Sequence, residues 1–168
     1  MAERLRLLRE GLTLEKALAS NDDMLLELTY PEKQEDFYSR LLMHKSEIEA
    51  LVCYHLGMKK TQSCRIGNVE EWMRGNYNVC IPIYVDEWVD RPRKKRVIIR
   101  IPFPYKVGES ENPGNVEEKL RCEAATFIWI KDNCPTVPIP YLWGFGFPDG
   151  QCVSTQWQMP MPDPTISG

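Results

Sequence analysis

Hydrophobic positions change their spacing along this chain, from a helix-like repeat near the N-terminus to short strand-like runs in the middle. Between residues 35 and 56 apolar side chains recur at steps of three and four, which is the period of an amphipathic helix. Gly57 stands where such a helix would end. We therefore predict a helix over residues 35–56, bent near residues 43–46. Residues 1–32 mix leucines with many charges and predict only weak helix or a loosely held arm.

The middle of the chain carries Val, Ile, Tyr and Trp in short runs separated by Gly, Asn, Asp and Pro. Runs of β-favouring residues between turn residues are typical of antiparallel strands. They predict three strands, over residues 63–72, 78–88 and 96–101. The turn between the first two is residues 74–78. The connection between the second and third, residues 89–95, is rich in Arg and Lys.

A second helix is predicted after a polar loop at residues 108–114. Asn115 fits the N-cap, and Glu118, three residues later, fits its capping-box partner. Apolar residues at helical spacing follow, and the pattern ends at Asn133, just before a Cys-Pro pair. Beyond a Pro-rich connection the sequence predicts two more strands, over residues 141–147 and 151–157.

The resulting order is helix, three strands, helix, two strands, which predicts an α+β fold. We divide the chain into a helical N-terminal extension (residues 1–62), a folded domain (residues 63–157) and an irregular, disordered tail (residues 158–168). The tail carries three prolines between residues 160 and 168 and almost no apolar periodicity.

Composition and charge narrow the classes of partner. The chain has 168 residues, 27% of them charged, and a net charge of −3, as in ordinary globular domains. This acidic balance gives no global positive field, so we expect no nucleic-acid partner. One basic run, residues 91–96, could contact phosphate, although a solvated hairpin tip is the favoured interpretation. No apolar run approaches the ~20 residues that span a bilayer, so we expect no membrane partner and a cytoplasmic location.

The spacing of cysteines and histidines argues against a zinc site. No CxxC pair occurs, and His44 and His55, the two histidines of the chain, are both interpreted as ordinary helix residues. The cysteines lie in apolar runs, which favours reduced, buried thiols. They are Cys53, Cys64, Cys80, Cys122, Cys134 and Cys152.

Two features of the middle segment bear on anion binding. Gly75, between two predicted strands, would let a phosphate approach the backbone, and consecutive amides in such a turn form an anion-binding concavity. The same Gly-Asn pair also fits a plain hairpin turn. Arg100 interrupts an apolar strand. The two-residue period of a strand puts Arg100 on the same face as Ile98 and on the opposite face from Ile99. A cation enclosed there requires an anion.

Four blocks of sequence, in this order, resemble the aminoglycoside-phosphotransferase and choline-kinase-like family, especially its divergent fungal-type members, which have the protein-kinase-like fold. The blocks are residues 74–78 (RGNYN), 96–100 (RVIIR), 118–123 (EKLRCE), and 134–140 (CPTVPIP) followed by Gly144-Phe145. The resemblance implies the small, nucleotide-binding lobe of that fold. This lobe has a five-stranded antiparallel sheet with one long helix after the third strand.

The resemblance also implies a site for the phosphates of ATP. Its residues are Gly75, Asn76, Tyr77 and Asn78 in a phosphate loop, Arg100 as the cation that contacts the nucleotide phosphates, and Glu123 as the ion-pair partner of Arg100. An arginine at this position would offer a bidentate fork in place of the point charge of a lysine.

The family's catalytic motifs are absent from this sequence. Neither the His-x-Asp motif with its downstream Asn nor the second Asp motif occurs, so we expect no catalytic residue here and no ligands for the Mg²⁺ that the family uses. ATP is expected to bind weakly, or only in a full-length form. The hypothesis is a truncated small-molecule kinase-like protein that holds the ATP-phosphate-binding lobe without the catalytic lobe.

Two other interpretations remain open at this point. One is a noncatalytic protein-interaction module, whose protein partner would cover the exposed face of the lobe. The other is a nonfunctional gene remnant. This segment does not identify the acceptor substrate of a kinase, since proteins that share one fold use many different acceptors.

Overall fold

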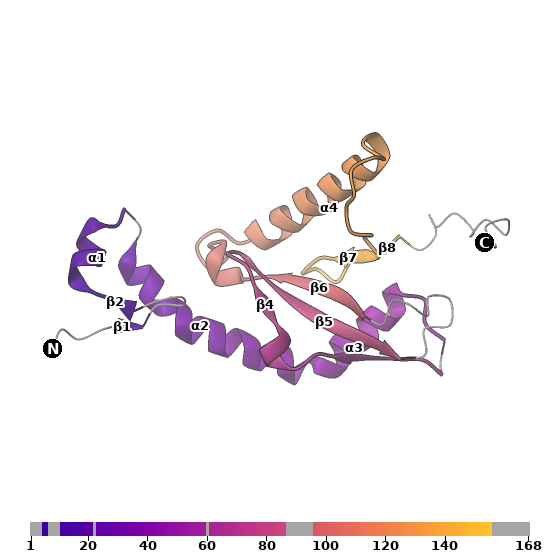
Figure 1. Cartoon of the computed structure of the whole chain (residues 1–168), viewed down its shortest axis with the longest axis horizontal. Helices are drawn as coiled ribbons and strands as arrows, with labels where there is room; N and C mark the ends of the chain where they lie inside the picture. Colours follow the sequence, from indigo (N-terminus) through magenta and orange to yellow (C-terminus); the bar gives the residue numbers. More distant parts are fainter. Residues whose placement is uncertain (1–4, 7–10, 22, 60, 87–95, 156–168) are drawn as a thin grey trace. The chain divides into compact units, whose positions relative to one another are not determined.

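The computed structural model describes residues 5–6, 11–21, 23–59, 61–86 and 96–155 (Figure 1). The chain forms two compact units, residues 1–45 and residues 46–168. Within the described residues the first unit holds a short pair of strands, β1 (Leu5–Arg6) and β2 (Gly11–Leu12), and two helices, α1 (Leu14–Ala19) and α2 (Met24–Met43). The basic run at residues 91–95 and the tail from residue 158 lie outside the described residues.

Helix α2 begins earlier than the sequence predicts. Its N-cap is Asp23, whose Oδ1 accepts hydrogen bonds from the amides of Leu25 and Leu26, both at 3.1 Å. This cap satisfies amides that the first turn would otherwise leave unpaired, so the helix starts at Met24 and includes Pro31. The single helix predicted over residues 35–56 is interrupted within the region predicted to bend, because α2 ends at Met43 and α3 (Lys45–His55) begins after His44.

The end of α3 follows the prediction. Gly57, at φ +62°, donates its amide to the carbonyl of Tyr54, and Met58 donates to the carbonyl of Cys53, each at 3.0 Å. These two bonds form a Schellman motif, in which a glycine takes the left-handed conformation that ends a helix. The chain then turns into the sheet.

The main sheet of the described residues is antiparallel and is built around one long strand. This strand, β5 (Asn78–Asp86), pairs with β6 (Arg96–Pro102) on one side. On its other side it pairs with β3 (Ser63–Ile66) and with β4 (Met73–Arg74). The predicted single strand over residues 63–72 is therefore wrong. A 3₁₀ turn at Val69–Glu71 interrupts it, and the Glu71 carboxylate accepts the amide of Asn68 at 2.8 Å there.

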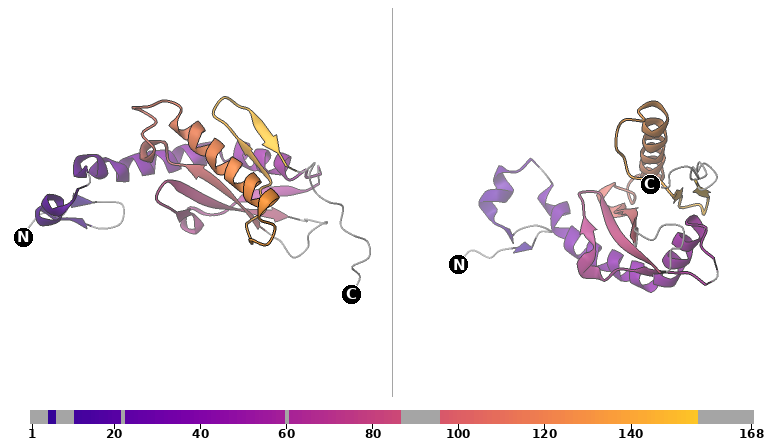
Figure 2. Two further views of the ribbon diagram at one scale, coloured as in Figure 1. Left: turned by 90° about the horizontal axis from the view of Figure 1, so that it is seen from above. Right: turned by 45° about the vertical axis from the view of Figure 1, so that its right-hand side comes forward.

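The two faces of the sheet differ in burial and in the helix that covers them. Val79, Ile81 and Ile83 of β5 are fully buried on one face, toward α3, from which Glu49 accepts the amide of Ile66 at 2.8 Å. The other face carries Arg100 and lies toward α4 (Asn115–Asn133). The views in Figures 1 and 2 show α3 and α4 on opposite sides of the sheet.

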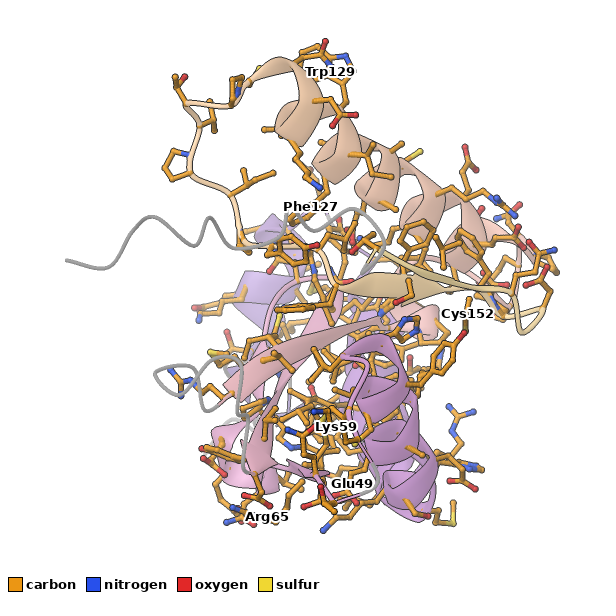
Figure 3. All side chains as sticks on the ribbon, turned by 90° about the vertical axis from the view of Figure 1, so that its right-hand side faces the viewer. Glu49, Lys59, Arg65, Phe127, Trp129 and Cys152 are labelled. Carbon is orange, nitrogen blue, oxygen red and sulfur yellow. The ribbon has the colours of Figure 1, made fainter. Side chains whose placement is uncertain are left out.

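Helix α4 ends at Asn133 as predicted, but its start is capped differently. The N-cap is Gly114, so Asn115 and Glu118 do not form the predicted capping box. Glu109 from the preceding loop takes that role, accepting the amides of Gly114 and Val116 at 2.8 and 2.6 Å. These backbone hydrogen bonds lower the pKa of Glu109. Figure 3 shows Trp129 on the part of α4 that rises away from the sheet.

The last two strands are shorter than predicted and pair with each other. They are β7 (Gly144–Gly146) and β8 (Cys152–Ser154), and in the described residues they form a separate two-stranded ladder. The hydrogen-bonded main sheet therefore has four strands, where the sequence analysis expected five. Pro138 and Pro140 in the approach to β7 have no amide hydrogen to donate to a neighbouring strand.

The described part of the chain is an α+β fold with helices α1 to α4 and an antiparallel sheet. None of its helices has the length and apolar character needed to cross a membrane.

Candidate functional site

The predicted phosphate loop is the tight connection between β4 and β5. The amide of Gly75 donates to the carbonyl of Asn78 at 2.9 Å, which closes the hairpin around Asn76 and Tyr77. The carbonyl of Tyr77 accepts the amide of Phe103 at 2.8 Å, so the loop is tied to the end of β6. The Gly75 amide is thus engaged inside the hairpin, and an anion at this loop would have to use other donors.

Gly75 itself is not demanded by the backbone. A Cβ added there would meet only the carbonyl oxygen of Asn78, at an ordinary contact distance of 3.5 Å. Tyr77 beside it is exposed. The loop therefore leaves open space over Gly75, which fits either a plain turn or a surface that a ligand approaches.

Arg100 lies on the sheet face predicted from the strand period. Along β6 the exposed positions alternate, and Ile98 and Arg100 share one face while Ile99 lies on the other. The ladder sets Arg100 opposite Cys80 and Asn78 opposite Pro102, so Arg100 lies at the end of the sheet next to the loop. Its side chain is 47% exposed. Arg100 is therefore half in solvent and not enclosed.

Three of the predicted site residues are brought into direct contact. The buried Asn78, with its amide oriented so that the oxygen faces the guanidinium, accepts from Arg100 Nη2 at 2.7 Å and from Nε at 3.2 Å. Arg100 Nη2 also lies 3.3 Å from Glu123 Oε1 on α4. The predicted ion pair is confirmed. Neither contact uses Nη1.

Lys119 completes this cluster and was missed by the sequence analysis. Its Nζ pairs with Glu123 Oε1 from one turn earlier on α4. The i, i+4 spacing of Lys119 and Glu123 was the signal that could have found it. Arg100, Lys119 and Glu123 together carry one positive charge in excess, and Asn78 is neutral. We call these four residues the Arg100 cluster.

The chemistry available to the Arg100 cluster is anion binding. Contacts with an amide oxygen and a carboxylate fix the plane of the Arg100 guanidinium. N–H donors in a fixed plane recognise the oxygens of a phosphate or carboxylate. The excess positive charge favours such a ligand. No general acid or base is identified among these residues.

The described residues contain no group of three or more His, Cys, Asp or Glu side chains that could hold a metal ion. Comparison of the chain with family models, with curated proteins and with solved structures found no match.

Proposed function

We propose that this chain provides the phosphate-binding part of a kinase-like small lobe, with ATP as its nucleotide. The observation that carries the proposal is the Arg100–Glu123 ion pair between a sheet strand and the helix that follows it. In a kinase-like lobe this pair orients the cation toward the nucleotide phosphates. The finer fold assignment, a protein-kinase-like small lobe, rests on the same pair and on the four sequence blocks.

The phosphates would lie over the end of the sheet, between the loop at residues 75–77 and the exposed edge of Arg100. Arg100 would contribute the N–H groups of Nη1, and Asn76 and Tyr77 would line the loop side of the phosphates, where the Gly75 amide is already engaged. Asn78 and Glu123 would position the guanidinium from behind. A small residue at position 75 keeps the path to the backbone open.

This assignment includes binding but no catalysis. Phosphoryl transfer depends almost entirely on positioning and on charge stabilisation by Mg²⁺, and the residues that would supply both are absent from this sequence. We therefore propose a nucleotide-binding lobe of a small-molecule kinase type, without transfer activity of its own. The family's adenine-gripping hinge has no matching residues here, so most of the affinity would come from the phosphates.

The test is a thermal-shift titration with Mg·ATP and, in parallel, with inorganic tripolyphosphate. Both should raise the melting temperature of the wild type, with affinities within about ten-fold of each other, because phosphate recognition dominates. Arg100→Met should abolish both shifts.

The matched control is Arg65→Met, which removes an arginine from β3, where its guanidinium lies 5.2 Å from the centre of the Tyr84 ring. This variant should respond to Mg·ATP as the wild type does. If Arg65→Met loses the shift and Arg100→Met keeps it, phosphate binds elsewhere and the proposal is wrong. An unshifted wild type at millimolar ligand would also refute it.

A further inference from the structure

Three sulfur atoms converge where α3 meets strand β3, on the sheet face opposite to Arg100. Cys53 lies in the last turns of α3, Met58 follows the end of that helix, and Cys64 is in β3. The Cys64 thiol donates to Met58 Sδ, with 3.1 Å between the two sulfurs. The Cys53 thiol lies close enough to that of Cys64 to raise its pKa.

Backbone features hold these residues in place. The Schellman motif at the end of α3 bonds the amide of Met58 to the carbonyl of Cys53 at 3.0 Å. Cys64 is paired with Val85 in the ladder between β3 and β5 and is only 7% exposed. Cys53 and Met58 are partly exposed, so solvent reaches the cluster from one side. The convergence is thus set by the fold and is accessible to a small ion.

Two carboxylates are anchored near the cluster. Glu49, one helical turn before Cys53, accepts the Ile66 amide at 2.8 Å, at the edge of the sheet where β3 runs (Figure 3). Asp86, at the end of β5, accepts the Ser63 hydroxyl at 3.1 Å. Burial, the contact with Cys53 and these two negative charges raise the pKa of the Cys64 thiol. The same negative charge favours a bound cation.

We propose that Cys53, Met58 and Cys64 form a binding site for a soft monovalent metal ion, Cu(I). Thiolate and thioether sulfurs are the ligands that select Cu(I) over harder cations. On binding, the two thiols each release a proton to solvent and form Cu–S bonds, and the Met58 sulfur donates a lone pair. Copper stays in the +1 state, so no oxidant or reductant is needed.

Zinc fits this site less well than Cu(I). A structural zinc site is closed by four nitrogen, thiolate or carboxylate ligands, and the described residues hold no cluster of even three such side chains. A set of two thiols and one thioether suits an ion that accepts three sulfurs. The proposal does not depend on nucleotide binding, because the two sites lie on opposite faces of the sheet.

Binding requires a small opening of the cluster. Metal–sulfur bonds of about 2.3 Å hold neighbouring sulfur atoms roughly 4 Å apart. The Cys64 and Met58 sulfur atoms, now 3.1 Å apart, must therefore separate by about 0.9 Å more. The Met58 side chain is unbranched and rotates about three bonds, which lets its sulfur move while the backbone stays in place.

The experiment titrates the reduced full chain with Cu(I) under anaerobic conditions, against a chromophoric Cu(I) chelator. The wild type should remove one equivalent of Cu(I) from the chelator. Cys53→Ser should weaken binding at least about ten-fold, and Met58→Leu, which keeps an apolar side chain of similar size, should weaken it measurably. X-ray absorption of the wild-type complex should show three sulfur neighbours.

Cys80→Ser is the matched control. Cys80 is paired with Met73 across the ladder between β4 and β5, so it also combines a thiol with a thioether, but on the other sheet face. Its loss should leave Cu(I) affinity unchanged. Circular dichroism of the metal-free variants checks that each is folded. The proposal is overturned if the wild type binds no better than a folded Cys53→Ser/Met58→Leu double variant, or if Cys80→Ser loses as much affinity as Cys53→Ser.

Discussion

Arg100 Nη2 lies 3.3 Å from Glu123 Oε1, and this contact joins strand β6 to helix α4. The two residues are far apart in the sequence and belong to separate elements, so only the packing of α4 against the sheet brings them together. Lys119 shares the same carboxylate oxygen, and the Asn78 amide oxygen accepts from Nη2 and Nε of Arg100. An ion pair thus joins β6 to α4 at the end of the sheet next to the loop at residues 75–77.

The ion pair should contribute little to stability. With the Arg100 side chain 47% exposed and that of Glu123 28% exposed, solvent screens the attraction. A double-mutant cycle with Arg100→Gln and Glu123→Gln, followed by urea unfolding, should give a coupling free energy of about 0.5 kcal/mol. A coupling free energy above about 3 kcal/mol would mean that the pair of Arg100 and Glu123 serves mainly to stabilise the fold, and not to orient Arg100 for a ligand.

Glu109 should stabilise the start of α4. Glu109→Gln removes the negative charge that accepts the amides of Gly114 and Val116, so the variant should melt at a lower temperature at pH 7. Glu111→Gln is the control, since Glu111 in the same loop accepts the Ser110 hydroxyl and caps no helix amide. Equal melting temperatures for the wild type and Glu109→Gln would contradict this role.

The effect of Glu109 should depend on pH in a defined direction. Its pKa in the folded chain is below the ordinary 4.5, so the unfolded chain binds more protons as the solution becomes acidic. The stabilisation is complete above pH 4.5 and is lost as the pH falls through the folded pKa. Unfolding measured at decreasing pH should therefore show the stabilities of the wild type and Glu109→Gln converging once the pH falls below the folded pKa of Glu109.

His55 should make stability fall in mildly acidic solution. This side chain is buried, and burial lowers its pKa below the ordinary 6.5. The folded chain therefore resists protonation that the unfolded chain accepts, and the free energy of unfolding decreases as the pH falls below about 6.5. His55→Gln should remove this decrease between pH 7 and pH 5. A decrease that persists unchanged in His55→Gln would contradict this role of His55.

Gly144 should not tolerate a side chain. A Cβ at this position would overlap the His55 ring and would lie 2.8 Å from the Val153 carbonyl oxygen. Gly144→Ala should therefore destabilise the chain by about 1–3 kcal/mol, because β7 or the His55 ring must shift. Gly75→Ala is the control, since its Cβ has room, and it should unfold within about 0.5 kcal/mol of the wild type. Equal stability of both variants would show that β7 does not pack on His55 as described.

Local patterns predicted much of this fold. The three- and four-residue spacing indicated the second half of α2, α3 and α4, and the position of Gly57 indicated the end of α3. The strand period put Ile98 and Arg100 on one face, as the structure has them. Each of these features depends on neighbours within a few residues, which a sequence displays directly.

Element boundaries that are set by one capping or turn-forming side chain, and contacts between separate elements, were not predicted in the same way. The start of α2 depends on the Asp23 side chain, and that of α4 on Glu109 from outside the helix. The break between β3 and β4 depends on a turn held by Glu71. The approach of Cys53 to Cys64 joins a helix to a strand, and no spacing rule for metal ligands detects it. The contact of Arg100 with Glu123 was anticipated only through a family resemblance.

An amide-resolved NMR titration of the full chain with Mg·ATP tests phosphate binding at the Arg100 cluster most directly. We expect saturable shifts confined to the loop at residues 75–78, to β6 around Arg100 and to α4 around Glu123, and their loss in Arg100→Met. Shifts that saturate elsewhere on the chain, or that persist unchanged in a folded Arg100→Met variant, would contradict it.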